Sequence, residues 1–220
     1  MIRNIVFDFG NVLVNYDFNL FLKSIFGDRK EEMAAFKAVA CTPENMDRYD
    51  KGDQPFPEVV ADLCAKYPQW EPEWREFTDR HVDVVLGEVP GMRALIGRLR
   101  EAGYGIYGLS NWSCIIYQVM ERFDILSVFD GRVISSEEKL IKPDEAIYHR
   151  LCDKYHLREE ECLFIDDNGR PVLEIVGHEN RVLAELDCRT DRQLPAAFRR
   201  TANRRKRKRL AGNRIRSGRR

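Results

Sequence analysis

The chain has 220 residues, of which 44% are hydrophobic and 33% charged, so it can bury a core as a globular protein of one domain or of one domain with an insertion. Its 36 basic residues equal its 36 acidic ones, but residues 199–220 hold 12 Lys or Arg and no Asp or Glu, so an acidic body precedes a basic tail. With no apolar run of 18 residues, no leader-like start and no C-x-x-C pair among the six cysteines, we expect a cytoplasmic protein with reduced thiols, not one that spans a membrane, is secreted or holds zinc.

The first predicted element is a strand near the N-terminus. Residues 2–9 form a short apolar run that only Asp8 interrupts, and Gly10 and Asn11 close it. An apolar run without alternation is typical of a strand covered on both faces, as in a parallel sheet. Asp8 is then expected at the carboxyl end of the strand, the edge where open α/β sheets bind their ligands.

Residues 16–85 have a different pattern. Apolar residues recur at helical spacing, first at Leu20, Phe21 and Ile25 and again from Met33 to Ala40. Five prolines interrupt this spacing: Pro43, Pro55, Pro57, Pro68 and Pro72. We predict a block of helices here, without a strand.

The second half of the chain alternates between strand and helix patterns. An amphipathic helix opens after Pro90 and ends at Gly103, and a buried strand follows over 105–111. Helices are predicted around 115–123 and 143–155, a short strand over 132–135 and a third buried strand over 162–165. This alternation predicts a doubly wound α/β core, with the helical block inserted after its first strand.

Polar residues follow three of the predicted strands. Asp8, Ser110 and the pair Asp166 and Asp167 each stand at a carboxyl end, and in a parallel sheet these ends lie at one edge. Lys142 precedes Pro143 in a loop that can reach the same place. Clustered carboxylates are unfavourable unless a cation neutralises them, and oxygen ligands of this kind suit Mg²⁺. We therefore predict phosphoryl transfer in a cleft at this edge.

At these residues the sequence resembles the haloacid dehalogenase (HAD) superfamily. Four of its motifs occur in order, at Phe7–Val14, Leu109–Asn111, Lys142–Tyr148 and Phe164–Asn168. The resemblance implies a Rossmann-like parallel sheet in residues 1–15 and 86–187 and an α-helical C1-type cap in residues 16–85. The remaining residues, 188–220, form a basic tail that resembles no tail of the family, and we expect it to be disordered. The closest likeness is to the bacterial sugar-phosphate phosphatases that begin F-D-x-G-N-V, which include an α-glucose-1-phosphate phosphatase.

The resemblance also implies roles for individual residues. Asp8 is the nucleophile and a metal ligand, and Lys142 is the catalytic residue that neutralises phosphate charge. Ser110, Asn111 and Lys142 bind the phosphate. The Mg²⁺ ligands are Asp8, the carbonyl of Gly10, Asp166 and Asp167.

Gly10 departs from the family pattern. The family usually has a second Asp at this position, and its carboxylic acid protonates the leaving group. Loss of a positioned acid lowers a rate by about 10²–10⁴-fold. The resembling subgroup shares the glycine, so we do not read it as inactivation, and Asp17 is one candidate replacement.

The family pattern is also lost after Asn168, where Pro171 stands in place of an expected Asn. A helix from 171 and a strand over 181–186 are still predicted. Three interpretations of the basic tail remain open: an electrostatic arm for nucleic acid, a segment without function, or translation out of frame after about Asn168.

The sequence thus predicts an enzyme, a Mg²⁺-dependent phosphatase that hydrolyses a small phosphomonoester, a sugar phosphate, through an aspartyl-phosphate intermediate. Its partner is a small phosphorylated substrate and not a membrane. The alternatives are a dehalogenase that uses Asp8 to displace halide and a weakly active phosphate-binding or nucleic-acid-associated protein that uses the basic tail.

Overall fold

The computed structural model describes residues 1–167, and its centre is a four-stranded parallel sheet. The strands are β1 (Asn4–Phe7), β4 (Gly105–Ser110), β5 (Gly131–Ile134) and β6 (Cys162–Ile165), in the order β5-β4-β1-β6. Ile5 of β1 lies opposite Ile106 of β4 and Leu163 of β6, and all three are buried. The parallel sheet predicted from the apolar runs is confirmed.

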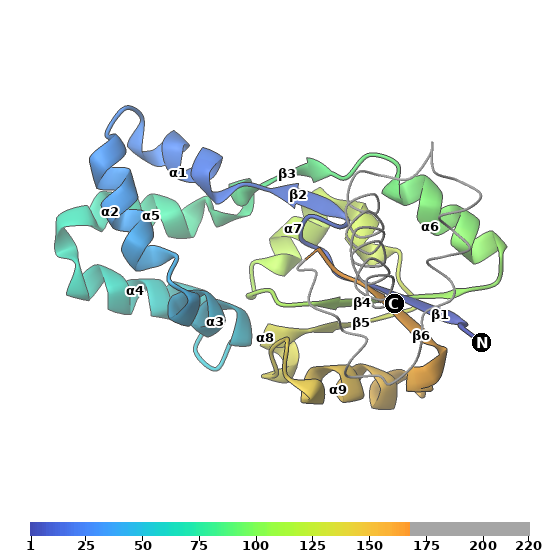
Figure 1. The fold of residues 1–220 in the computed structure, drawn as a ribbon. Coiled ribbons are helices and arrows are strands. Elements are labelled where there is room, and N and C mark those ends of the chain that lie inside the picture. Colours follow the sequence, from blue (N-terminus) through green and yellow to red (C-terminus); the bar gives the residue numbers. More distant parts are fainter. Residues whose placement is uncertain (168–220) are drawn as a thin grey trace, which may run out of the picture.

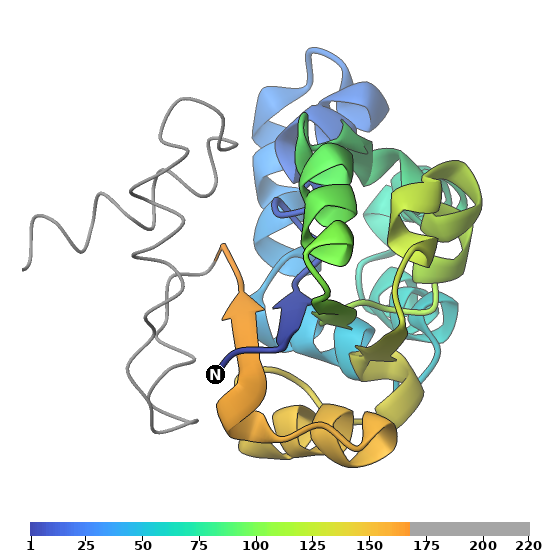
Figure 2. The same cartoon turned by 90° about the vertical axis from the view of Figure 1, so that its right-hand side faces the viewer.

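Helices cover both faces of this sheet. Helices α6 (Met92–Glu101) and α7 (Ile116–Arg122) lie over one face, and α8 (Ser135–Glu138) and α9 (Glu145–Tyr155) lie along the other (Figures 1 and 2). Ile147 and Leu151 of α9 pack with Val6, while residues of α6 pack in the larger cluster on the opposite face. The protein therefore has the three-layer α/β/α arrangement that the sequence predicts.

A block of five helices lies at the carboxyl edge of the sheet (Figure 1). Its members are α1 (Phe18–Phe26), α2 (Lys30–Ala40), α3 (Pro43–Lys51), α4 (Phe56–Lys66) and α5 (Glu71–Asp79). Three of the prolines that break the apolar spacing, Pro43, Pro57 and Pro72, lie in the first turns of these helices. A first-turn N–H has no partner within the helix, so proline is tolerated there and marks where each helix begins.

The helical block has its own aromatic core. Phe36, Trp74 and Phe77 are buried, and the ring centroid of Phe36 lies 4.2 Å from that of Trp74 and 5.6 Å from that of Phe77. Four short 3₁₀ helices in residues 1–167 join the longer elements: Pro68–Trp70, His81–Val84, Asp124–Ser127 and Glu159–Glu161. No helix among these residues is both long and apolar enough to cross a membrane.

The prediction that residues 16–85 contain no strand is wrong at both ends of that range. Strand β2 (Val14–Tyr16) pairs in antiparallel fashion with β3 (Val85–Glu88), and Tyr16 lies opposite Val85. Elements of three and four residues are too short to show a periodic pattern. The expected helix from 171, the strand over 181–186 and the basic tail lie outside the described residues.

The end of α3 packs closely on α8. The Ser135 hydroxyl donates to the Asp50 carbonyl at 2.5 Å, and the Lys139 ammonium donates to the Gly52 carbonyl. Gly52 has a φ of +70°, and a Cβ added there would lie 2.7 Å from Cβ and 2.8 Å from Cα of Ser136. Only glycine fits this approach, because both the backbone angle and the available space exclude a side chain.

Gly52→Ala is therefore expected to lower the free energy of unfolding by about 1–3 kcal/mol. Gly103→Ala is the matched control, because Gly103 also has a positive φ, +85°, but nothing lies within 4 Å of an added Cβ. Gly103→Ala keeps the backbone strain but creates no collision, so it should lower the free energy of unfolding by clearly less than Gly52→Ala does. Denaturant unfolding measures both, and equal losses would contradict a tight contact between α3 and α8.

Candidate active site

Asp8 is buried directly after β1, at the carboxyl edge of the sheet. Its Oδ1 atom accepts hydrogen bonds from the Phe9 N–H at 2.7 Å and from the Ser110 hydroxyl at 2.8 Å, and the Lys142 Nζ atom lies 3.1 Å away. These three contacts all go to Oδ1, and no side chain or N–H group among the described residues is seen to bind Oδ2. The carboxylate is thereby held in one orientation, with Oδ2 as the oxygen available to a ligand.

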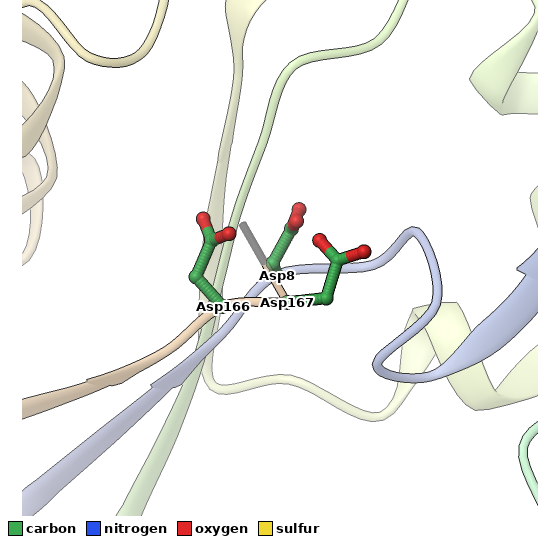
Figure 3. Close-up of side chains that lie close together, drawn as sticks. All are labelled: Asp8, Asp166 and Asp167. Atoms are coloured by element: carbon green, nitrogen blue, oxygen red, sulfur yellow. The ribbon is translucent and has the colours of Figure 1, made fainter. Parts of the chain in front are cut away.

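Two further carboxylates face Asp8. One oxygen each of Asp8, Asp166 and Asp167 can be chosen so that all three lie within 4.8 Å of one another (Figure 3). The Lys142 Nζ atom lies 2.7 Å from Asp166 Oδ2, and the Asn11 amide donates to Asp167 Oδ2 at 3.3 Å. Three carboxylates beside one ammonium group leave an excess of negative charge, and the donor set fits a hard divalent cation.

The pKa shifts in this cluster agree with a shortage of positive charge. Burial raises the pKa of Asp8, although the neighbouring Lys142 ammonium opposes the rise. Burial also raises the pKa of Asp167. Burial would lower the pKa of Lys142, but the charges of Asp8 and Asp166 outweigh it and the pKa is raised. The lysine is therefore held in its charged form.

Asn111 holds the loop that carries Lys142. Its amide nitrogen donates to the Lys142 carbonyl at 3.0 Å, and the Lys142 N–H donates to the amide oxygen of Asn111 at 2.8 Å. The side chain of Asn111 thus pairs with backbone, and that of Ser110 donates to Asp8. Contact of either residue with a phosphate group stays a prediction.

A cavity of about 530 Å³ lies between the sheet edge and the helical block. Its lining includes all seven residues predicted for the site: Asp8, Gly10, Ser110, Asn111, Lys142, Asp166 and Asp167. The helical block and its connections contribute Tyr16, Asp47, Asp50 and His81 among others. The structure therefore brings the predicted residues together and adds a second wall that the sequence analysis did not identify.

The ring of Tyr16 occupies the space beside Gly10, where the family usually has an aspartate side chain. A Cβ added at Gly10 would lie 2.7 Å from Cε1 of Tyr16, so the tyrosine ring occupies the space in which an aspartate side chain would begin. Asp17, the candidate replacement, does not line the cavity. Its carboxylate accepts the N–H groups of Asn19 and Leu20 at 2.7 and 3.0 Å, so it caps helix α1.

Asp50, in the last turn of α3, is one of two acidic residues of this wall, with Asp47, that the sequence analysis missed. Burial raises its pKa to about 7, with further contributions from the negative charges of Asp47 and Asp8. The positive charge of Lys142 and a hydrogen bond from the Ser113 N–H limit the rise. No local pattern marks Asp50, because its place in the cavity depends on how α3 packs against the sheet edge.

The raised pKa of Asp50 predicts a pH-dependent contribution to stability. A carboxyl group with a folded-state pKa of about 7 and an ordinary value of 3.8 stabilises the fold fully below the ordinary value, and this contribution is lost as the pH rises through 7. Asp50→Asn removes the titration, so the variant should gain in melting temperature relative to wild type between about pH 4 and pH 7. Thermal unfolding in a chelator tests this, and parallel curves for the two proteins would contradict it.

Two comparisons of this sequence with known proteins agree with each other. A family model described as haloacid dehalogenase-like hydrolase matches residues 2–172. The chain is 26% identical over 187 residues to a D-ribitol-5-phosphate phosphatase of Bacteroides thetaiotaomicron, and the match covers 77% of this chain and 84% of the relative.

Solved structures share the fold. A haloacid dehalogenase family enzyme of Bacteroides thetaiotaomicron, in complex with magnesium and inorganic phosphate, superposes with a TM-score of 0.61 at 20% identity and covers 80% of this chain and 89% of its own. A dehalogenase superposes with a TM-score of 0.56 at 18% identity and covers 80% of each chain. Because enzymes with different names share this fold, the chemistry has to be argued from the site itself.

Proposed function

This chain belongs to the haloacid dehalogenase-like hydrolases, and within that family we propose that it hydrolyses a small phosphomonoester, a sugar phosphate, with Mg²⁺ and an aspartyl-phosphate on Asp8. The observation that carries the proposal is the arrangement around Asp8. An oriented carboxylate with one available oxygen lies beside a lysine and two further carboxylates in the wall of a cavity. A nucleophile, a metal site and a cation for phosphate are thereby combined.

The residues present fit a magnesium ion. Asp8, Asp166 and Asp167, with the carbonyl of Gly10, would hold it, and such oxygen donors are the ligands that Mg²⁺ takes in phosphate-binding sites. When bound, the ion supplies positive charge to the phosphate oxygens and to the ionised form of Asp8.

In the proposed reaction, Oδ2 of Asp8 attacks phosphorus while the bond from phosphorus to the leaving oxygen breaks. The phosphoryl group is then carried on Asp8, and water hydrolyses it to inorganic phosphate and restores the carboxylate. Lys142 places its ammonium 3.1 Å from Oδ1, the other oxygen of the Asp8 carboxylate, and neutralises charge on the phosphoryl group. The Ser110 hydroxyl and the Phe9 N–H keep the attacking carboxylate in position.

The composition of the cavity supports a substrate that carries no charged group besides the phosphate to be released. Lys142 is the single Lys or Arg among the described residues that line it, and this lysine already pairs with Asp8 and Asp166. The helical block instead contributes carboxylates and aromatic rings to the opposite wall. A sugar or polyol presents hydroxyl groups to such a wall, whereas a second phosphate or a carboxylate would be repelled. The phosphatase relative is named for a polyol phosphate.

The experiment is a screen for release of inorganic phosphate from D-ribitol 5-phosphate, ribose 5-phosphate, glucose 1-phosphate, a nucleoside monophosphate, a sugar bisphosphate and 4-nitrophenyl phosphate, with a 2-haloacid as a further substrate. Each is assayed with Mg²⁺ and with a chelator. We expect release from monophosphates of sugars or polyols that requires Mg²⁺. Halide release that is insensitive to the chelator, without phosphate release, would favour the dehalogenase alternative.

The non-enzymatic alternative depends on the basic tail. That segment lies outside the described residues, and nothing in the described part of the chain favours nucleic-acid binding over catalysis. The phosphate screen tests this alternative as well, because a protein that only binds phosphate would not turn over any of the substrates.

A further inference from the structure

The site lacks a proton donor where one is needed. When the bond between phosphorus and a sugar oxygen breaks, the departing alkoxide has to be protonated, because an alkoxide is a poor leaving group. Gly10 has no side chain to do this, and the ring of Tyr16 fills the neighbouring space. A positioned acid elsewhere in the lining of the cavity would supply this proton faster than solvent does.

Other titratable groups that line the cavity can be compared with Asp50. His81 packs against Phe56, with ring centroids 4.4 Å apart, and burial lowers its pKa to about 4, so at neutral pH it is in its neutral form and not in the acidic imidazolium form. Burial raises the pKa of Tyr16 and of Tyr148, which makes both weaker acids. Asp47 is exposed.

Asp50 differs from these groups in how it is fixed. Its carbonyl accepts the Ser135 hydroxyl at 2.5 Å, and the same hydroxyl accepts the Trp112 N–H at 2.9 Å. Its carboxylate accepts the Ser113 N–H, which belongs to the loop that follows Ser110 and β4. Backbone and side chain of Asp50 are thus both anchored to the edge of the sheet that carries Asp8.

Asp50 also lies within electrostatic reach of the reacting group. It lines the same cavity as Asp8, and its charge acts on Tyr16, whose ring adjoins Gly10. Asp8, Asp166 and Asp167 form the carboxylate cluster, and Asp50 stands outside it. An acid held on the wall opposite the nucleophile is placed to reach the leaving oxygen of a substrate bound between them.

Building on the proposed function, we propose that Asp50 is the general acid of this enzyme and replaces the residue missing at position 10. As Oδ2 of Asp8 bonds to phosphorus, the Asp50 carboxyl group gives its proton to the leaving oxygen, which departs as the alcohol. The resulting carboxylate is protonated again from solvent after the alcohol has left, and it takes no part in the attack of water on the phosphoryl group.

The electrostatic surroundings support this role. The groups whose charge or hydrogen bond acts on the carboxyl are Asp47 on its own helix, Asp8 after β1, Lys142 before α9 and the Ser113 N–H after β4, and the charge of Asp50 acts in turn on Tyr16. Burial and the two carboxylates outweigh the lysine and the hydrogen bond, and the pKa of Asp50 is raised to about 7. A carboxyl group with such a pKa is protonated in part of the molecules at neutral pH, as a general acid must be.

The test is Asp50→Asn assayed on two substrates: the sugar or polyol phosphate of the panel that wild type turns over fastest, and 4-nitrophenyl phosphate. We expect kcat to fall by about 10²-fold on the first and by less than about threefold on the second, whose leaving group needs no proton. Glu44→Gln removes a carboxylate from the exposed start of the same helix and should leave both rates unchanged.

Two further measurements make the outcome decisive. In wild type, the alkaline fall of kcat should appear with the sugar or polyol phosphate and be absent with 4-nitrophenyl phosphate, and this comparison does not depend on the folding of a variant. Asp50→Glu should keep part of the rate that Asp50→Asn loses. Equal losses on both substrates, no loss on either, or the same alkaline limb for both would overturn the role of Asp50. Absence of phosphate release by wild type from any substrate would instead overturn the proposed function.

Discussion

Asp8→Asn is expected to lower kcat for phosphate release by about 10³-fold or more, because it removes the nucleophile of the proposed reaction. The asparagine is nearly isosteric and its amide oxygen can still accept the Phe9 N–H and the Ser110 hydroxyl, which donate to Oδ1 of Asp8 at 2.7 and 2.8 Å. The fold should therefore survive, and the loss should appear in kcat and not as unfolding. Steady-state assays on 4-nitrophenyl phosphate and on the best sugar phosphate, together with thermal unfolding, measure this.

Asp17→Asn is the matched control for that variant. Asp17 lies near Asp8 in the sequence, but its carboxylate caps α1 and it does not line the cavity. The same chemical change there should leave kcat unaltered. Activity of Asp8→Asn close to that of wild type would remove the aspartyl-phosphate mechanism, whatever the control shows.

Lys142→Met is expected to have the second largest effect, a loss of about 10²–10³-fold in kcat, because it removes the cation that neutralises the phosphoryl group. The Lys142 side chain is 10% exposed and its Nζ atom lies 3.1 Å from Asp8 and 2.7 Å from Asp166. Its removal takes the ammonium group away from two carboxylates. Loss of one member of a buried ion pair lowers the free energy of unfolding by about 3–5 kcal/mol.

The stability of Lys142→Met should also respond to metal. In a chelator the variant is expected to melt well below wild type, and Mg²⁺ should restore more stability to the variant than it adds to wild type, because the ion then replaces part of the missing charge. Lys154→Met is the control, since the Lys154 side chain is 36% exposed and its partner Glu138, 2.7 Å away, keeps a second ion pair with Arg150 at 2.6 Å, so its loss should lower stability by less than about 1 kcal/mol. Wild-type kcat in Lys142→Met would contradict the role given to the lysine.

The sheet and one wall of the site could be predicted because local patterns carry them. Strands β1, β4 and β6 are short apolar runs without alternation, which mark them as central strands, and in parallel strands the residues that follow them must meet at one edge. That topology brings Asp8, Ser110 and Asp166 together from distant parts of the chain.

The other wall could not be predicted, because it depends on packing. Asp50 reaches the cavity through the contact of α3 with α8, where Gly52 allows the close approach to Ser136. Neither Asp50 nor Gly52 belongs to a sequence pattern that indicates the contact between α3 and α8. The pairing of Tyr16 with Val85 is likewise too short to be seen in sequence, and it places the ring of Tyr16 against Gly10.

Asn111 illustrates a different limit. A polar residue next to Ser110 at a strand end predicts contact with a ligand, but the amide group of Asn111 pairs with both backbone groups of Lys142 across 31 positions in sequence. The path of the loop that carries Lys142 determines this partner. The residue type indicates a polar contact, and only the fold shows with which group.

The most direct test of the central claim is to detect the covalent intermediate. Wild-type protein is mixed with 4-nitrophenyl phosphate and Mg²⁺, quenched in acid and digested, and the peptides are examined by mass spectrometry. The proposed mechanism predicts a phosphoryl group on the peptide that contains Asp8, formed with Mg²⁺, absent with a chelator and accompanied by a burst of nitrophenol. Steady release of phosphate without a burst and without a phosphoryl group on Asp8, or with that group on another residue, would contradict it.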